Sequence, residues 1–253
     1  IINVGVLHSR SGPMAISENT VAEAELMAIT EINRAGGISI QGRKLLLRPI
    51  EEDGASDPQT FAHRAERLIN DYTVAVVFVG WTSDSRKAML PVFELADHLL
   101  FYPVQYEGRE QSRNIFYFGA TPNQQVDPGI HWLIENSSTD FFLIGSDYVY
   151  PRTVNAIIET QIDTLGGRVV GKRYIPIGPA GLAPVIDAIA AALPDGGTII
   201  NTINGENNVE FFTQAAAAGL TAANGYTIMS FSLAEEEVSA IGAQYLAGTY
   251  AVW

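Results

Sequence analysis

One stretch of the chain decides its fold: Gly80-Trp81-Thr82-Ser83-Asp84-Ser85-Arg86-Lys87. It follows the apolar run Val74–Val79, and the segment after it has apolar residues at helical spacing, namely Met89, Leu90, Val92, Phe93 and Leu95. Hydroxyl-rich residues therefore stand where a strand ends and a helix begins. The first N–H groups of a helix have no partner within the helix, and the helix dipole favours an incoming oxygen atom. The junction predicts either a helix cap at Thr82 or Ser83, or a site for the carbonyl oxygen of a small neutral ligand.

Strands and helices alternate along the whole chain. We expect strands at Asn3–Leu7, Lys44–Ile50, Val74–Val79, Asp140–Ile144, Arg168–Tyr174, Thr198–Thr202 and Tyr226–Ser230. We expect helices at Glu18–Ala35, Pro58–Asp71, Ser83–Ala96, Gln125–Glu135, Arg152–Leu165, Leu182–Leu193 and Asn207–Ala218. Such alternation predicts an α/β protein with doubly wound parallel sheets. The units fall into two sets, an N-terminal lobe of residues 1–119 and a C-terminal lobe of residues 120–249, with a ligand cleft expected between them.

The composition excludes several classes of protein. The chain carries 28 acidic and 15 basic residues, which give a formal net charge of −13 at pH 7. Nucleic acids and anionic membrane surfaces both require Lys and Arg, so we expect neither as a partner. No apolar run approaches the roughly 18 residues of a membrane-spanning helix, so no membrane insertion is expected. The chain has no cysteine, which excludes disulfides and thiolate catalysts.

Catalytic and metal-binding motifs are absent from the sequence. It contains no nucleophile elbow, no P-loop and no dinucleotide-binding fingerprint. The histidines are isolated, with no second His at metal-ligand spacing, so we expect no enzyme activity, metal or cofactor. We expect a structural role for His8 at the end of the first strand. We also expect the acidic cluster Glu51-Glu52-Asp53 to be solvated.

Three further junctions share the polar character of the first. Each follows the carboxyl end of an expected strand, and the four together supply hydroxyls, amides, backbone N–H groups and aromatic rings. A neutral polar ligand needs this mixture, because it offers donors, acceptors and flat surfaces that exclude water. The three junctions are Gly145–Arg152, Asn201–Asn207 and Ser230–Glu235.

Long ordered runs resemble the periplasmic urea- and short-amide-binding proteins of bacterial ABC transport and amide sensing. They are Gly5–Gly12, Glu52–Asp57, Ser85–Ala88, Leu100–Pro103, Pro122–Gln125, Gly145–Tyr148 and Ala234–Val238. The resemblance implies a type I periplasmic binding protein fold with two lobes. Positions that match the family's amide contacts are Ser83, Tyr102, Tyr148, Asn204 and Ser232. The residue types at the junctions add Trp81, Thr82 and Glu206 to the expected ligand contacts, with Glu206 as an acceptor for the N–H groups of urea.

The resemblance also implies a function. We expect a non-enzymatic solute-binding protein that delivers urea to an ABC transporter permease in the inner membrane. Val104 and Gln105 replace a hydroxyl residue and a proline of the amide sensors, so the chain is more similar to the urea transporters' component. The implied location is the periplasm or the extracellular space. The signal peptide would have been removed, and the protein could carry a lipid anchor before trimming.

Other functions stay open. One alternative is an amide-sensing receptor domain, and another is a branched-chain amino-acid binder of the same fold. An enzyme acting on urea or amides is disfavoured, because its motifs are missing. Family members continue past the equivalent of Leu246–Trp253, so we expect residues 250–253 to begin a crossover to the first lobe and the rest of that C-terminal segment to be missing.

Overall fold

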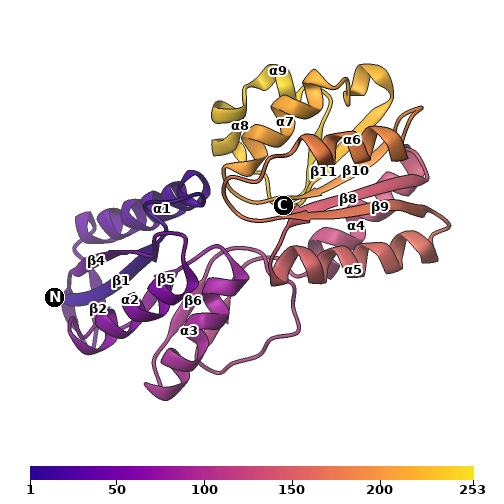
Figure 1. Cartoon of the computed structure of the whole chain (residues 1–253). Coiled ribbons are helices and arrows are strands. Elements are labelled where there is room, and N and C mark those ends of the chain that lie inside the picture. Colours follow the sequence, from indigo (N-terminus) through magenta and orange to yellow (C-terminus); the bar gives the residue numbers. More distant parts are fainter. The chain divides into compact units, whose positions relative to one another are not determined.

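The computed structural model describes residues 1–253, and the chain forms two compact units (Figure 1). The first comprises Ile1–Gln105 and Arg109–Gly119, and the second comprises Tyr106–Gly108 and Ala120–Trp253. Each unit contains one five-stranded sheet in which all strands are parallel. The α/β class with two parallel sheets, expected from the alternation of strands and helices, is confirmed.

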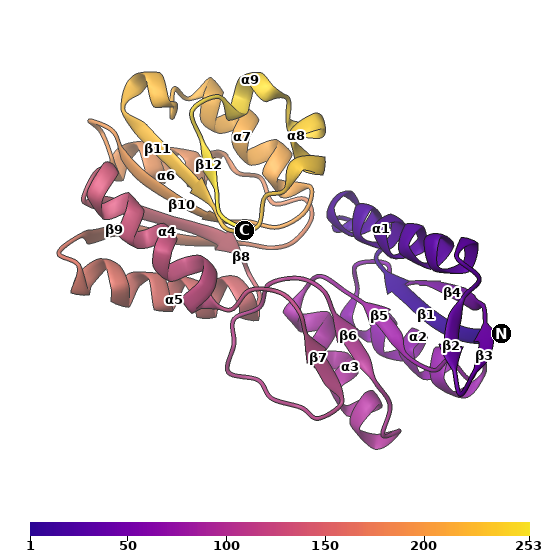
Figure 2. The same cartoon turned by 180° about the vertical axis from the view of Figure 1, so that it is seen from behind.

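The first unit has helices on both faces of a sheet whose strand order is β4-β1-β5-β6-β7. Figure 2 shows β6 and β7 side by side at one end of this sheet. Because the strands are parallel, the loops that follow β1, β4, β5 and β6 leave from the same edge. The elements are β1 (Ile2–His8), α1 (Ala15–Arg34), β2 (Ile38–Ile40), β3 (Arg43–Leu45), β4 (Leu47–Asp53), α2 (Pro58–Asn70), β5 (Val77–Val79), α3 (Ser83–Leu95), β6 (Leu100–Tyr102) and β7 (Ile115–Tyr117).

Local signals start and stop the helices of this unit. Asp57 precedes α2 and accepts a hydrogen bond from the backbone N–H of Thr60 at 2.7 Å, with Pro58 at the first helical position. At the end of α1 the backbone N–H of Gly37 donates to the carbonyl of Ile32. Gly37 has a φ of 82°, and a Cβ there would lie 2.2 Å from the carbonyl oxygen of Leu45, so only glycine fits.

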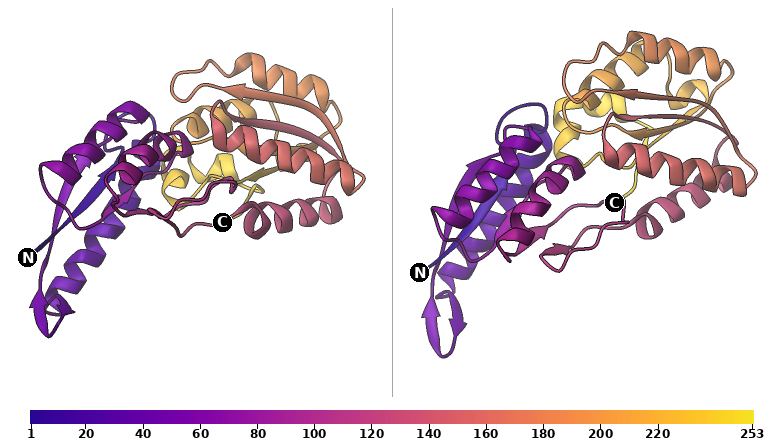
Figure 3. Two further views of the ribbon diagram at one scale, coloured as in Figure 1. Left: turned by 90° about the horizontal axis from the view of Figure 1, so that it is seen from below. Right: turned by 60° about the horizontal axis from the view of Figure 1, so that its bottom comes forward.

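The expected strand at Lys44–Ile50 is split in the structure. Arg43–Leu45 pairs antiparallel with Ile38–Ile40, whereas Leu47–Asp53 pairs parallel with β1. The chain changes pairing partners at Leu46, after β3 ends and before β4 begins. The hairpin β2–β3 projects from the first unit in both views of Figure 3.

The second unit has the strand order β12-β11-β10-β8-β9. Successive residues of a strand face opposite sides of a sheet, so Phe141 and Leu143 pack with α4 and α5, while Phe142 and Ile144 pack with α6 and α7. The elements are α4 (Pro122–Asn136), β8 (Asp140–Ser146), α5 (Val149–Thr164), β9 (Arg168–Ile175), α6 (Ala183–Ala192), β10 (Gly197–Thr202), α7 (Asn207–Ala217), η1 (Ala222–Asn224), β11 (Tyr226–Ser230), α8 (Glu235–Ile241), α9 (Ala243–Leu246) and β12 (Tyr250–Ala251).

The end of the chain differs from the expectation. We expected residues 250–253 to leave the C-terminal lobe, but Tyr250 and Ala251 pair with β11 in the sheet of the second unit. The backbone N–H of Val252 also donates to the carbonyl of Ser230 at 3.0 Å. The free edge of β11 offers unpaired N–H and C=O groups, and this short strand satisfies them. The second unit therefore extends to Trp253.

Candidate binding site

The β5–α3 junction starts with a helix cap. Thr82 precedes α3 in an extended conformation, and its hydroxyl accepts from the backbone N–H of Ser85 at 3.3 Å. The Thr82 and Ser85 hydroxyls also lie 2.7 Å apart. Thr82 rather than Ser83 is therefore the cap. Ser83 is the first residue of α3 and is only 1% exposed.

Trp81 and Tyr102 meet at this junction. Tyr102 ends β6, is fully buried, and its hydroxyl donates to the backbone carbonyl of Trp81. Trp81 is itself buried. Since β6 lies next to β5 in the sheet, residues about twenty positions apart in sequence lie close together here. Of the predicted ligand contacts, Trp81, Thr82, Ser83 and Tyr102 are therefore clustered in the first unit.

A buried arginine, not anticipated as part of the site, lies beneath this junction. Arg86 is fully buried; one of its terminal nitrogens, Nη1, donates to Ser83 Oγ at 3.0 Å, and its Nε donates to Glu110 Oε1 at 2.6 Å. Lys87 Nζ pairs with the other oxygen of Glu110 at 2.6 Å. Burial acts to raise the pKa of Glu110, but hydrogen bonds from Arg86 and Lys87 lower that pKa to about 2. Arg86 shares a helical face with Met89 and Phe93, both buried, and this spacing was the available sequence signal.

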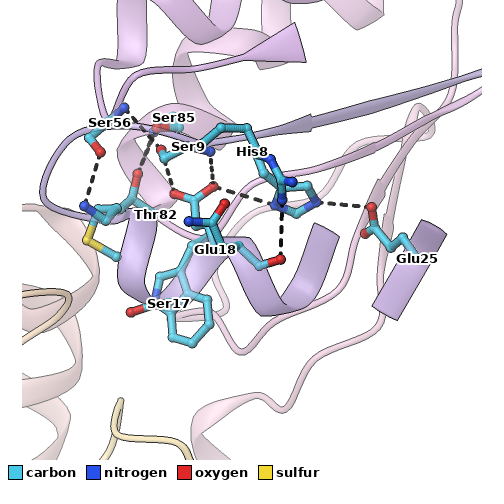
Figure 4. A network of polar contacts seen from close by, with 12 residues as sticks. His8, Ser9, Ser17, Glu18, Glu25, Ser56, Thr82 and Ser85 are labelled. Atoms are coloured by element: carbon cyan, nitrogen blue, oxygen red, sulfur yellow. Dashed lines mark hydrogen bonds and ion pairs between the residues drawn. The ribbon is translucent and has the colours of Figure 1, made fainter. Parts of the chain in front are cut away.

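A second polar network lies at the ends of β1 and β4 (Figure 4). Glu18 of α1 accepts from the backbone N–H and the hydroxyl of Ser9, each at 2.8 Å. His8 is fully buried between Glu18 and Glu25, with its Nδ1 and Nε2 at 3.5 and 3.1 Å from their carboxylate oxygens. Burial acts to lower the pKa of His8, but hydrogen bonds to Glu18 and Glu25 raise that pKa to about 9. The network fixes the chain after β1, as the expected structural role of His8 implies.

The acidic cluster at the end of β4, Glu51-Glu52-Asp53, is not merely solvated. Asp53 accepts from the Ser11 hydroxyl at 2.7 Å and from the backbone N–H of Ala55 at 2.7 Å. Partial burial acts to raise the pKa of Asp53, but these hydrogen bonds lower it below its ordinary value. Glu52 forms ion pairs with Arg64 and Arg67 of α2. The cluster therefore ties the loop after β1 and helix α2 to the end of β4.

The second unit has three polar junctions at one edge of its sheet, after the neighbouring strands β8, β10 and β11. The backbone N–H of Asn204 donates to Ser146 Oγ at 3.0 Å, which links the first two junctions. Asn201 Nδ2 donates to Ser230 Oγ at 3.0 Å, which links the second and third. Hydrogen bonds therefore hold the three junctions in one arrangement. Ser146 and Asn201 were not among the predicted site residues, because the sequence does not show which strands are neighbours.

The predicted contacts of this unit lie in different surroundings. Tyr148 and Ser232 are buried, and Tyr148 precedes α5 with its ring 6.4 Å from that of Tyr150. Asn204 is buried, and its side-chain N–H donates to the carbonyl of Thr202. Glu206 is exposed at the start of α7, in an open pocket with Gly178 and Pro179. Glu206 is therefore the weakest of the predicted contacts.

The chemistry of both units suits binding. No group of three or more His, Asp or Glu side chains is placed to hold a metal ion. The junctions present hydroxyls, amides and backbone N–H groups, which recognise oxygen and N–H groups of a small molecule. None of the helices has both the length and the apolar character needed to cross a bilayer.

Known proteins similar to this chain share its family and its fold. A family model described as "Periplasmic binding protein domain" matches residues 2–253. A Leu/Ile/Val-binding protein homolog 7 of Brucella abortus is 35% identical over 95 residues, which make up 38% of this chain and 23% of that protein. The substrate-binding protein LivJ of Streptococcus pneumoniae, in complex with isoleucine, superimposes with a TM-score of 0.80 at 18% identity over 99% of this chain and 70% of that chain.

A solute-binding protein of an ABC transporter from Rhodopseudomonas palustris, in complex with 3,4-dihydroxybenzoic acid, has a TM-score of 0.78 at 20% identity. The similarity covers 91% of this chain but 61% of that one, so this chain is shorter than its solved relatives. These likenesses establish the type I periplasmic binding protein fold. The matching family is one of binding proteins rather than enzymes. The chain belongs to the family of periplasmic binding protein domains.

Proposed function

We propose that this protein is the solute-binding component of an ABC importer and delivers a small polar solute to a permease in the inner membrane. The observation that carries the proposal is the buried β5–α3 junction, where Ser83, Trp81 and Tyr102 meet at the start of a helix. A helix N-terminus attracts an oxygen of a ligand. Membership of a periplasmic family and the titles of the similar proteins support the transport role and a location outside the cytoplasm.

Urea or a short amide is the ligand that the chemistry of the site favours. The buried charged groups at the ends of β1 and β5 are paired within the protein, since Arg86 pairs with Glu110 and His8 lies between two glutamates. The groups that remain for recognition are hydroxyls and amides, which match a neutral ligand. In urea both amino groups donate, so replacing one by the methyl group of acetamide leaves an acceptor of the site without its hydrogen bond. That loss costs about 1–3 kcal/mol, so urea should bind more tightly than acetamide.

A branched-chain amino acid is the ligand that the comparisons favour. The Brucella relative is named for leucine, isoleucine and valine, and LivJ was solved with isoleucine. The carboxylate of such a ligand would suit the N-terminus of α3. Its ammonium group would need a carboxylate partner, and Glu206 is an exposed acidic residue at one of the predicted junctions.

A thermal-shift screen followed by calorimetric titration distinguishes these ligands. Urea, acetamide, isoleucine and 4-hydroxybenzoate would each be added to the purified chain. A ligand at 100 times its Kd stabilises the folded state by about 2.7 kcal/mol, which is a readily measured rise in Tm. A response to urea above that to acetamide supports the urea transporter, and a response to isoleucine alone supports the amino-acid transporter. Absence of any response would contradict the proposed function.

The amide sensor uses the same fold and the same kind of ligand. It differs in its partner, because a sensor reports to a cytoplasmic regulator and an importer docks on a permease. Genes for permease and ATPase subunits beside the gene of this protein would support import.

A further inference from the structure

The hairpin β2–β3 and the residues beside it carry positive charge that the rest of the chain does not share. Residues 33–50 contain four basic side chains and no acidic one, namely Arg34, Arg43, Lys44 and Arg48. The rest of the chain has the other 11 of the 15 basic residues against all 28 acidic ones. The net charge of −13, from which we expected no anionic membrane surface as a partner, therefore conceals a local excess of cations.

These four cations are available to an outside partner. All four side chains are exposed, and none of them forms an ion pair with a carboxylate. Arg48 Nε donates to the side-chain oxygen of Asn3 at 2.8 Å, which leaves the charge of Arg48 uncompensated. The acidic residues that flank the segment, Glu31 and Glu51, pair with none of the four, and Glu51 faces Arg10 instead, at 4.0 Å. Exposed cations without a counter-charge attract anions.

The hairpin also exposes aliphatic side chains beside these cations. Its two strands are joined by Gln41 and Gly42, whose φ values of 49° and 75° form a tight two-residue turn. Ile40 pairs with Arg43 across the strands, and residues paired in this way lie on the same face. Ile40 is 42% exposed, and Leu46 at the end of the hairpin is 46% exposed. Cations and aliphatic groups are therefore mixed on a ribbon that projects from the first unit (Figure 3).

The hairpin lies at the end of the first unit that is remote from the candidate site. The backbone N–H of Ile2, the first residue of β1, donates to the carbonyl of Leu46 at 2.8 Å. The hairpin is therefore at the amino ends of β1 and β4, whereas the β5–α3 junction follows the carboxyl end of β5, which is parallel to β1. A strand of seven residues such as β1 spans roughly 20 Å. A partner bound to the hairpin would leave this junction uncovered.

We propose that the hairpin β2–β3 binds the surface of a bilayer that contains anionic phospholipids. Lipid phosphates attract Arg and Lys, and exposed aliphatic groups are stabilised at the boundary between headgroups and acyl chains. Acidic residues farther from the bilayer than about 8 Å are largely screened at physiological ionic strength, so the projecting hairpin is attracted although the whole chain is acidic. An acidic protein surface would match the cations but would not account for the aliphatic groups between them. The inference goes beyond the proposed function and does not depend on which solute binds.

Co-sedimentation with vesicles tests the proposal. The purified chain would be mixed with vesicles of phosphatidylcholine alone and with vesicles in which a third of the lipid is phosphatidylglycerol. We expect binding to the anionic vesicles only. That binding should be lost between about 0.1 M and about 1 M salt, because the Debye length falls from about 10 to about 3 Å. Each Lys or Arg near an anionic surface contributes about fivefold in affinity, so Arg43→Gln/Lys44→Gln should weaken binding about 25-fold.

Arg168→Gln/Arg173→Gln is the matched control. It removes the same charge from two exposed side chains of strand β9 in the second unit, and vesicle binding should stay within about twofold of that of the unaltered chain. Equal losses in the two double variants would show that net charge alone governs binding, and would overturn the proposal. Equally strong binding to the phosphatidylcholine vesicles would also overturn it. If a solute binds in calorimetry but the anionic vesicles do not, the inference fails while the proposed function stands.

A fluorescent probe shows which part of the chain meets the bilayer. The chain has no cysteine, so Ser39→Cys on β2 and Ser239→Cys on α8 each provide a single site for an environment-sensitive dye. Both serines are exposed. On anionic vesicles the emission should shift to shorter wavelength at residue 39 and stay unchanged at residue 239. An equal shift at both positions, or an equal shift at residue 39 with a polyglutamate peptide or a short DNA duplex in place of vesicles, would overturn the assignment of the hairpin to a lipid surface.

Discussion

Raising the pH from 6 to 9.5 should destabilise the first unit by about 3 kcal/mol. His8 carries the effect, because its pKa is raised from 6.5 to about 9 in the folded chain. Each unit of pKa difference corresponds to about 1.36 kcal/mol, and the difference here is about 2.5 units. Since the folded pKa is the higher one, the stabilisation is complete below pH 6.5 and is lost as the pH rises through about 9.

Tryptophan fluorescence during guanidinium chloride unfolding measures this loss in the unit concerned. The chain has three tryptophans, and a variant with Trp132→Phe and Trp253→Phe leaves Trp81 as the reporter of the first unit. Unfolding curves at several pH values between 6 and 9.5 give the free energy of unfolding at each. Guanidinium is preferred over urea as denaturant, because urea is a candidate ligand.

Glu25→Gln provides the matched variant. It keeps a hydrogen-bonding group 3.1 Å from His8 Nε2 but removes one of the two charges that favour protonation. The pKa of His8 should fall toward its ordinary value, and the loss of stability between pH 6.5 and 9 should shrink. The imidazole ¹⁵N signals of His8 report its pKa directly. Stability that stays constant from pH 6 to 9.5, or a His8 that titrates at or below pH 6.5, would refute this reasoning.

Three further outcomes follow from the contacts described. Hydrogen bonds hold the pKa of Glu110 at about 2, so the protein should lose stability as the pH falls from 4.5 through 2. The loss should be about 1–2 kcal/mol after allowance for solvent screening on the Lys87 side. Glu110→Gln should remove this acid dependence, and an acid profile that is unchanged in that variant would contradict the reasoning. Gly119→Ala should destabilise the protein by about 3 kcal/mol in thermal unfolding, because the added Cβ would lie 1.9 Å from the Val104 carbonyl. Gly42→Ala adds a Cβ with no atom within 4 Å and should cost only about 1 kcal/mol. Equal losses in the two variants would count against the close approach at Gly119. Urea should not be hydrolysed, since no catalytic pair or metal cluster is present; ammonia release that a Ser83→Ala substitution abolishes would contradict the binding role.

Much of the fold follows from signals that act over a few residues. Asp57 and Thr82 cap their helices through hydrogen bonds to residues three positions ahead, and glycine ends α1, so the long helices were expected near their observed positions. The three-residue strands β6 and β7 were missed, because nothing within so short a segment marks a strand. Their existence depends on pairing with neighbours, and sequence alone does not show the partner.

The candidate site, too, was predicted only where the signal is local in the sequence. Thr82 and Ser83 were found because a polar run stands between a strand and a helix. Arg86 and Glu110 are 24 positions apart and meet only because β6 and β7 lie beside β5 in the sheet. His8 illustrates the same limit, since its partners lie one and three turns into α1, and only the fold shows that their carboxylates point at the imidazole.

Calorimetric titration of the unaltered chain against Ser83→Ala and Tyr148→Phe tests the central claim most directly. One substitution lies in each unit, and each removes a hydroxyl with little volume, so the fold should be retained. We predict that urea or isoleucine binds the unaltered chain with one ligand per chain, and that each substitution weakens that binding roughly tenfold while the unliganded variant still unfolds cooperatively. Undiminished affinity in both variants, or no binding of any probe to the unaltered chain, would contradict the account of a solute-binding protein that uses these junctions.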